Sequence, residues 1–81
     1  MSNLALIFCL SGNRWTVQCK STDVIGDVFN KFCGKAQLKL SDVLFYFNSI
    51  EVKKDSGKTI EALGLKNNTA LDVVQKDVLG A

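Results

Sequence analysis

Three cysteines, Cys9, Cys19 and Cys33, carry the most reactive side chains of this 81-residue chain, which contains no histidine. A thiol attacks a substrate or binds a metal as its thiolate, and a neighbouring base or positive charge usually produces that form. The cysteines are widely spaced and form no CxxC pair, so the usual zinc-ligand pattern is absent. Each lies within an apolar stretch. We therefore expect three reduced, buried thiols in an intracellular protein, cytoplasmic or nuclear, with no metal and no other cofactor.

The remaining polar residues form no recognisable catalytic pattern. The acidic residues are dispersed, no histidine is present to act as a general base, and the glycines stand singly rather than in a phosphate-binding loop. These features predict that the protein is not an enzyme and has no catalytic residue.

The charge and hydropathy of the chain limit its classes of partner. Ten basic against eight acidic residues give a net charge of +2, spread along the sequence, whereas nucleic-acid binding favours a dense basic face. No apolar run approaches the roughly 18–20 residues of a membrane span. The first apolar run, Leu4 to Leu10, lacks the basic start and cleavage site of a signal peptide and is interpreted as a strand. We expect no nucleic acid and no membrane among the partners.

The first half of the chain predicts a hairpin followed by a helix. The run Leu4–Leu10 is apolar, 11–13 has turn residues, and 14–20 alternates strictly between polar and apolar. In the first strand either Ile7 or the set Leu4, Leu6 and Phe8 could face the core. Residues 21–34 then change to a helical period.

The helix prediction depends on an apolar stripe at Ile25, Val28, Phe29 and Phe32. Thr22 or Asp23 is expected to cap its start, and Gly34 to end it. Gly26, inside the helix, is tolerated if the helix packs on a sheet at that point.

The second half predicts three strands and one helical turn. Strands are expected over 43–47, 50–52 and 70–76, with a charged loop over 53–58 and a short helix over 59–65 that Thr59 caps. The order is β-β-α-β-β-(short helix)-β, which predicts a two-layer α+β domain. The predicted core is Leu6 or Ile7, Trp15, Val17, Ile25, Val28, Phe32, Phe45, Phe47, Leu63, Leu65, Leu71 and Val73.

Three stretches resemble the ubiquitin-like superfamily, which has the β-grasp fold. "CKSTDVIGDVFNKFCG" resembles the helix region of ubiquitin and SUMO, "FYFNSIEV" resembles ubiquitin's strand–turn–strand, and "TIEALGLKNNTALDVVQ" is closest to SUMO-like domains. The resemblance covers nearly the whole chain. It implies a monomeric ubiquitin-like domain over 1–76 and a flexible C-terminal tail over 77–81.

The resemblance to ubiquitin also implies a protein-binding face. Leu10, Tyr46 and Val74 fall at the positions of ubiquitin's exposed apolar patch, and Ile50 at its border. This placement predicts a non-catalytic protein–protein interaction domain whose partners are receptors or enzymes of the ubiquitin-pathway type. The alternative is that Tyr46 is a strand residue with a solvated hydroxyl and no partner.

The resemblance to SUMO implies a second, edge-on binding mode. SUMO adds an extended peptide beside its second strand, next to the helix. The matching residues here are Thr16, Gln18, Lys20, Phe29 and Lys31. Positive charge near this edge is sparser than SUMO places there.

The C-terminus departs from the family's usual Gly-Gly. The chain ends Val78-Leu79-Gly80-Ala81. One alternative function is therefore a covalent ubiquitin- or SUMO-like modifier, activated at Gly80 after trimming. A second is a β-grasp sulfur carrier that uses the same glycine.

Overall fold

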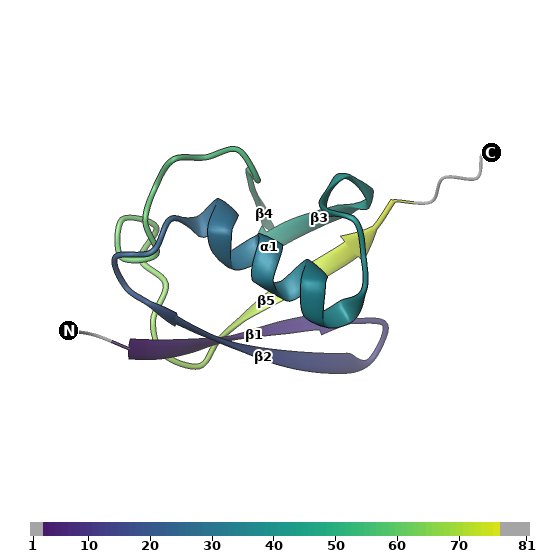
Figure 1. The fold of residues 1–81 in the computed structure, drawn as a ribbon, viewed down its shortest axis with the longest axis horizontal. Helices are drawn as coiled ribbons and strands as arrows, with labels where there is room; N and C mark the ends of the chain where they lie inside the picture. The colour runs from purple at the N-terminus through teal and green to yellow at the C-terminus, as the bar shows by residue number, and fades with distance from the viewer. Residues whose placement is uncertain (1–2, 77–81) are drawn as a thin grey trace.

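The computed structural model describes residues 3–76, which form one sheet and one helix (Figure 1). Two connections between strands are long: the segment 21–42, which contains the helix, joins β2 to β3, and the segment 53–68 joins β4 to β5. The elements are β1 (Asn3–Leu10), β2 (Asn13–Lys20), α1 (Ile25–Ala36), a 3-10 turn η1 (Leu40–Asp42), β3 (Val43–Phe47), β4 (Ile50–Val52) and β5 (Thr69–Gln75).

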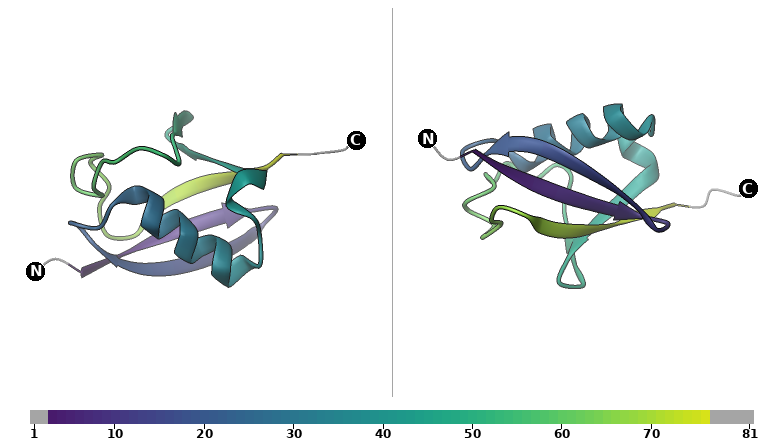
Figure 2. Two further views of the ribbon diagram at one scale, coloured as in Figure 1. Left: turned by 45° about the horizontal axis from the view of Figure 1, so that its top comes forward. Right: turned by 90° about the horizontal axis from the view of Figure 1, so that it is seen from below.

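The five strands form one mixed sheet in the order β2-β1-β5-β3-β4. The central pair, β1 and β5, is parallel, and the other pairs are antiparallel. Figure 2 shows α1 lying across one face of this sheet, while the opposite face has no helix over it. This is the two-layer α+β architecture that the sequence predicted, and the side facing α1 is called the inner face below.

The alternation of β1 resolves the ambiguity left by its sequence. Leu4, Leu6 and Phe8 are buried on the inner face, whereas Ile7 and Cys9 are only half-buried on the other side. Leu6 is therefore the core residue of the Leu6/Ile7 pair. The first strand places its largest side chains toward the helix because only that side offers a layer to pack against.

Aromatic rings fill the space between helix and sheet. Phe29 of α1 stacks on Phe45 of β3 at a centroid distance of 3.7 Å, and Phe32 stacks on Phe8 of β1 at 4.6 Å. Trp15 lies at one end of this aromatic cluster, where its ring packs edge-to-face with Phe32 at a centroid distance of 5.6 Å. Its side chain stays partly exposed. The predicted core is confirmed at Val17, Ile25, Val28, Phe32, Phe45, Leu65, Leu71 and Val73, while Trp15, Phe47 and Leu63 are only partly buried.

Both ends of α1 differ from the sequence-based expectation. Its N-cap is Val24, whose apolar side chain cannot accept a hydrogen bond. The carboxylate of Asp23, one of the two predicted caps, accepts from the Lys20 N–H instead (2.9 Å). The helix also continues past Gly34 to Ala36. Gln37 ends it in the left-handed conformation (φ 59°), and the Leu38 N–H returns to the Cys33 carbonyl. The prediction that the helix ends at Gly34 was wrong, because a glycine ends a helix only where its backbone adopts positive φ.

Gly26 lies where α1 meets the charged loop 53–58. A Cβ built on Gly26 would lie 2.9 Å from the Lys54 carbonyl oxygen, closer than real Cβ contacts. The Lys54 ammonium in turn donates to the carbonyls of Leu40 (3.0 Å) and Val43 (2.8 Å). The close approach predicted at Gly26 is therefore made by a loop backbone rather than by the sheet.

The short helix expected over 59–65 is a hydrogen-bonded turn. It has one bond of the α-helical type, from the Leu63 N–H to the Thr59 carbonyl, and two of the 3-10 type, from Leu63 to Ile60 and from Gly64 to Glu61. The predicted cap is present, because Thr59 Oγ1 accepts from the Ala62 N–H (3.2 Å). Gly64 then adopts φ 76°, which ends the turn before a second helical turn can form.

Candidate interaction surface

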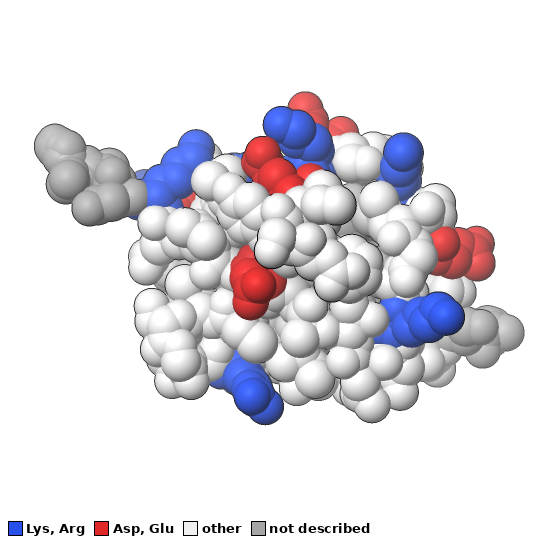
Figure 3. Space-filling model, turned by 180° about the vertical axis from the view of Figure 1, so that it is seen from behind, with Lys and Arg blue, Asp and Glu red and all other residues white. Residues whose placement is uncertain are grey.

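The outer face of the sheet carries apolar side chains with no layer over them. Figure 3 views this face and shows largely uncharged surface, with acidic atoms in its middle and basic groups toward the rim. Its apolar members come from the three inner strands of the sheet. We define the outer patch as Ile7, Cys9, Leu44, Tyr46, Ala70 and Val74.

Tyr46 stands on the outer face, as predicted, between two carboxylate residues. It lies opposite Glu51 of β4 on one side and Asp72 of β5 on the other. Its strand neighbour Phe45 points the other way and is fully buried. Tyr46 itself is half-buried, as is typical of a side chain with a strand on either side and no layer over its face of the sheet.

Val74 shares this face with Tyr46. Its side chain is 47% exposed, and it lies opposite Leu44, two residues before Tyr46 on β3. Such cross-strand diagonal neighbours are within reach of each other's side chains. Tyr46 and Val74 therefore form one continuous surface, as the resemblance implied.

Leu10 does not belong to this surface. It is only 9% exposed and packs in the core cluster, so its predicted place on the binding face was wrong. The reason is the period of two along β1. Leu10 is two residues after Phe8 and therefore points toward the helix as Phe8 does.

Ile50 is exposed, but not beside Tyr46. It lies opposite Phe47, and the alternation of the hairpin places both on the side of Phe45. Ile50 is 70% exposed because β4 is a short edge strand that extends beyond the helix. Its predicted place at the border of the outer patch was wrong. It lines instead a separate apolar groove of about 630 Å³ with Phe47, Val52, Leu63 and Leu65, rimmed by Asn48, Glu51, Lys53, Asp55, Ser56 and Lys58.

Phe29 does not face the edge of β2. Its side chain is fully buried against Phe45 and Phe8, so its prediction as a peptide-contacting residue was wrong. In the helical stripe it shares the core-facing side with Ile25 and Phe32, and the four-residue spacing from Ile25 repeats that direction.

The predicted peptide-addition edge is a true edge strand, but its backbone is partly occupied. The Thr16 carbonyl accepts from the Lys35 ammonium (2.7 Å), and both the N–H and the carbonyl of Lys20 bond to Asp23. Backbone groups along a strand point alternately to either side, so the N–H and carbonyl of Gln18 point to the same free edge as those of Thr16 and Lys20. An added strand would therefore have to displace Lys35 before it could pair along the full length of β2.

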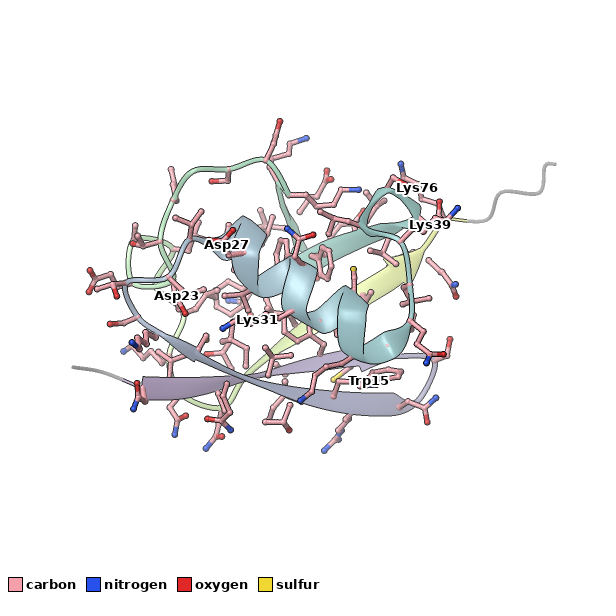
Figure 4. All side chains as sticks on the ribbon, viewed as in Figure 1. Trp15, Asp23, Asp27, Lys31, Lys39 and Lys76 are labelled. Carbon is pink, nitrogen blue, oxygen red and sulfur yellow. The ribbon has the colours of Figure 1, made fainter. Side chains whose placement is uncertain are left out.

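Two shallow hollows lie along this edge and meet at Gln18 and Lys31. Figure 4 shows Lys31 reaching from α1 over the space between the helix and β2. Lys20 and Lys35 add positive charge to the hollows, and Asp23 adds one negative charge. The edge is thus moderately basic, and binding of a peptide there stays a prediction.

The three thiols are free and do not share one environment. Cys19 and Cys33 are buried, and burial raises the pKa of each thiol above its ordinary value, so both are neutral at pH 7. Cys9 is only half-buried on the outer face, which corrects the expectation that all three are buried. Within residues 3–76, no three His, Cys, Asp or Glu side chains come together as metal ligands.

Two further observations concern the ends and the hydropathy of the chain. Gly80, the predicted conjugation terminus, and the predicted tail 77–81 lie outside the described residues. The helix found in residues 3–76 is neither long nor apolar enough to cross a membrane.

One notable residue of the outer face was missed from the sequence. Asp72 is exposed in the middle of β5, the central strand, directly between Cys9 and Tyr46. The signal was present in the run Leu71-Asp72-Val73-Val74, because aspartate is depleted in strands.

Comparison with solved structures identifies the fold. The chain superposes on the ubiquitin-like domain of an Arabidopsis thaliana protein with a TM-score of 0.86 at 15% identity, covering 100% of this chain and 85% of that one. A second structure of the same domain gives a TM-score of 0.84. ATBAG1, solved in complex with HSP70, gives 0.81 at 8% identity, over 93% of this chain and 41% of that one.

Comparison of the sequence, by contrast, finds no match. The chain matches no protein-family model and no curated protein. The fold is therefore the ubiquitin-like β-grasp, established by structure rather than by sequence identity.

Proposed function

We propose that this protein is a non-catalytic ubiquitin-like interaction domain that binds other proteins through the outer patch. The observation that carries the proposal is the exposure of Val74 at 47%, beside an outward Tyr46, on the sheet face that no helix covers (Figure 2). A sheet face without a covering layer leaves apolar surface for a partner. Receptors or enzymes of the ubiquitin-pathway type are the partners that the fold suggests.

The structural neighbours support a protein partner in general terms. ATBAG1, which shares the fold over 93% of this chain, has been solved in complex with HSP70. The shared fold supports protein binding as a kind of function, whereas an identity of 8% gives no support for HSP70 as the partner of this chain. The three free thiols support a location inside the cell, cytoplasmic or nuclear.

Paired substitutions test the proposal. Tyr46→Ala and Val74→Ala are compared with wild type and with Asn30→Ala, a control at an exposed position of α1, on the opposite side of the sheet from the outer patch. Each variant is used for affinity capture, and each captured protein is then purified and titrated calorimetrically. We expect partners that bind wild type and Asn30→Ala alike but lose about tenfold or more affinity for Tyr46→Ala, as for an aromatic anchor.

Folding of each variant is checked in parallel by NMR. The proposal fails if affinity is unchanged in both Tyr46→Ala and Val74→Ala. It also fails if Tyr46→Ala unfolds the domain, because Tyr46 would then be a packing residue.

Conjugation through Gly80 is the alternative that the sequence suggests, and it is tested with a chain from which Ala81 has been removed, so that the Gly80 carboxylate is free. This chain is incubated with an activating enzyme and ATP, and the enzyme is examined by mass spectrometry. A thioester ending at Gly80 would establish a modifier, whereas an interaction domain forms none.

A further inference from the structure

Asp72 occupies a position that packing does not explain. It lies on β5, the central strand of the sheet, where β-branched and aromatic residues are favoured and aspartate is depleted. Its neighbours across both ladders are Cys9 and Tyr46, so it stands inside the outer patch rather than at its rim. A residue that breaks the local rule without a structural gain marks a functional position.

The charge of Asp72 is not balanced within the described part of the chain. Between residues 3 and 76 the only ion pair is that of Lys53 with Glu51 (3.4 Å), and the hydrogen bonds include none made by the Asp72 side chain. The basic residue in the same row of the sheet is Arg14, which lies opposite Cys9 on β2. Arg14 is thus two strands from Asp72, roughly 10 Å away.

A partner that covers the outer patch must therefore remove an unpaired carboxylate from water. Burying such a charge costs several kcal/mol unless an opposite charge accompanies it. A wholly apolar partner would bind with a binding free energy reduced by this cost, so the outer patch disfavours such partners. A cation placed over Asp72 offsets the cost.

Tyr46 adds a reason for that cation to be a guanidinium. Tyr46 lies opposite Asp72 on the neighbouring strand, and its side chain stays partly exposed on the same face. A guanidinium can pair with a carboxylate and stack on an adjacent aromatic ring at the same time, which an ammonium does less well. We propose that the outer patch binds a protein segment that is apolar around a central basic residue, preferably arginine, which pairs with Asp72 and stacks on Tyr46. This rests on the proposed function and specifies the chemistry of its partner.

A selection experiment tests this chemistry directly. A three-helix scaffold with one randomised face is displayed on phage and selected on the full 81-residue chain. Binders are kept when Tyr46→Ala abolishes their binding, which places them on the outer patch. We expect these binders to carry Arg or Lys at the centre of the selected face. Selection on Asp72→Lys is expected to give Asp or Glu at that position instead.

Affinity measurements then quantify how much the pairing of Asp72 with the binder's central arginine contributes to binding. Replacing the central arginine of a selected binder by citrulline, which keeps the shape and removes the charge, is expected to weaken binding to wild type about tenfold or more. The same replacement should change binding to Asp72→Asn by less than about threefold. Glu51→Gln is the matched control, because that carboxylate already has Lys53, and it should leave the effect of citrulline intact.

The outcomes separate this inference from the proposed function. Tyr46-dependent binders without a basic preference, or a citrulline effect that persists in Asp72→Asn, would overturn the inference and leave the interaction face in place. Failure to obtain any Tyr46-dependent binder would overturn both.

Discussion

The two faces of the sheet differ in how strongly packing restricts their residues. On the inner face, Phe8 and Phe45 are fully buried and meet the rings of Phe29 and Phe32. On the outer face, the next residues along the same strands are Cys9 and Tyr46, which are half-exposed. The strands are shared, so the difference comes only from the presence of α1 on one side.

This contrast teaches where to look for function. Inner-face side chains are chosen for volume and shape, because interiors are close-packed. Outer-face side chains need only tolerate a strand, so the presence of Tyr46 and Asp72 side by side is not required by the fold. Substitutions on the inner face should therefore change stability, and those on the outer face should change binding.

The largest effect is expected on the inner face. Phe45→Ala should lower the free energy of unfolding by about 3–5 kcal/mol, since it opens a cavity among stacked rings. Its strand neighbour Leu44, on the outer face, is the matched control. Leu44→Ala should cost less than about 1 kcal/mol. Urea denaturation followed by circular dichroism measures both, and equal losses would contradict the assignment of the two faces.

The next effect concerns the close approach of the helix to the loop. Gly26→Ala should destabilise the domain by about 1–3 kcal/mol, because the new methyl would lie 2.9 Å from the Lys54 carbonyl. Gly34→Ala, in the same helix with open space around it, should instead stabilise by up to about 1 kcal/mol. Thermal unfolding distinguishes the two, and a stabilising Gly26→Ala would show that the loop moves away freely.

A smaller effect of opposite sign is expected on the outer face. Asp72→Thr should raise the free energy of unfolding by up to about 1 kcal/mol, because threonine suits a central strand better. Asp72→Asn, which removes the charge but keeps a poor strand residue, should change stability less. Chemical denaturation of the three proteins checks this order. A loss of stability in Asp72→Thr would mean that Asp72 has a structural role.

The smallest effect on stability is expected from the thiols. A small methanethiosulfonate reagent at pH 7.5 should modify Cys9 first and change stability by less than about 0.5 kcal/mol, as for a surface substitution. Cys19 and Cys33 should react only on unfolding, since burial shields them and raises the pKa of each thiol. Mass spectrometry of the intact protein gives the order of labelling, and early reaction of Cys33 would contradict it.

The raised pKa values of Cys19 and Cys33 also predict that the free energy of unfolding falls at high pH. Folding favours the protonated form of Cys19 and Cys33, so this contribution is fully present below the ordinary thiol pKa of 9.0. It is lost as pH rises through the higher pKa of the folded state. Replacing both cysteines by alanine should therefore flatten the fall of stability above about pH 9.

Several local features differ from what the sequence predicted. The end of α1 moved from Gly34 to Gln37 because the backbone, and not the residue type, adopted positive φ. The Thr59 turn kept its predicted cap but did not extend into a helix. The positions of Leu10 and Ile50 followed from strand alternation, which a resemblance between sequences does not track.

The sequence alone determined the order of elements, the two-layer architecture and most of the core, because periods of two and of 3.6 record which side of each element is dry. It also placed Tyr46 outward between two phenylalanines that face the helix side of the sheet. Only the tertiary structure decided which strands neighbour one another, and so brought Asp72 beside Tyr46 and separated Ile50 from both. A surface is a property of several strands together, and local periodicity holds no information about which strands meet.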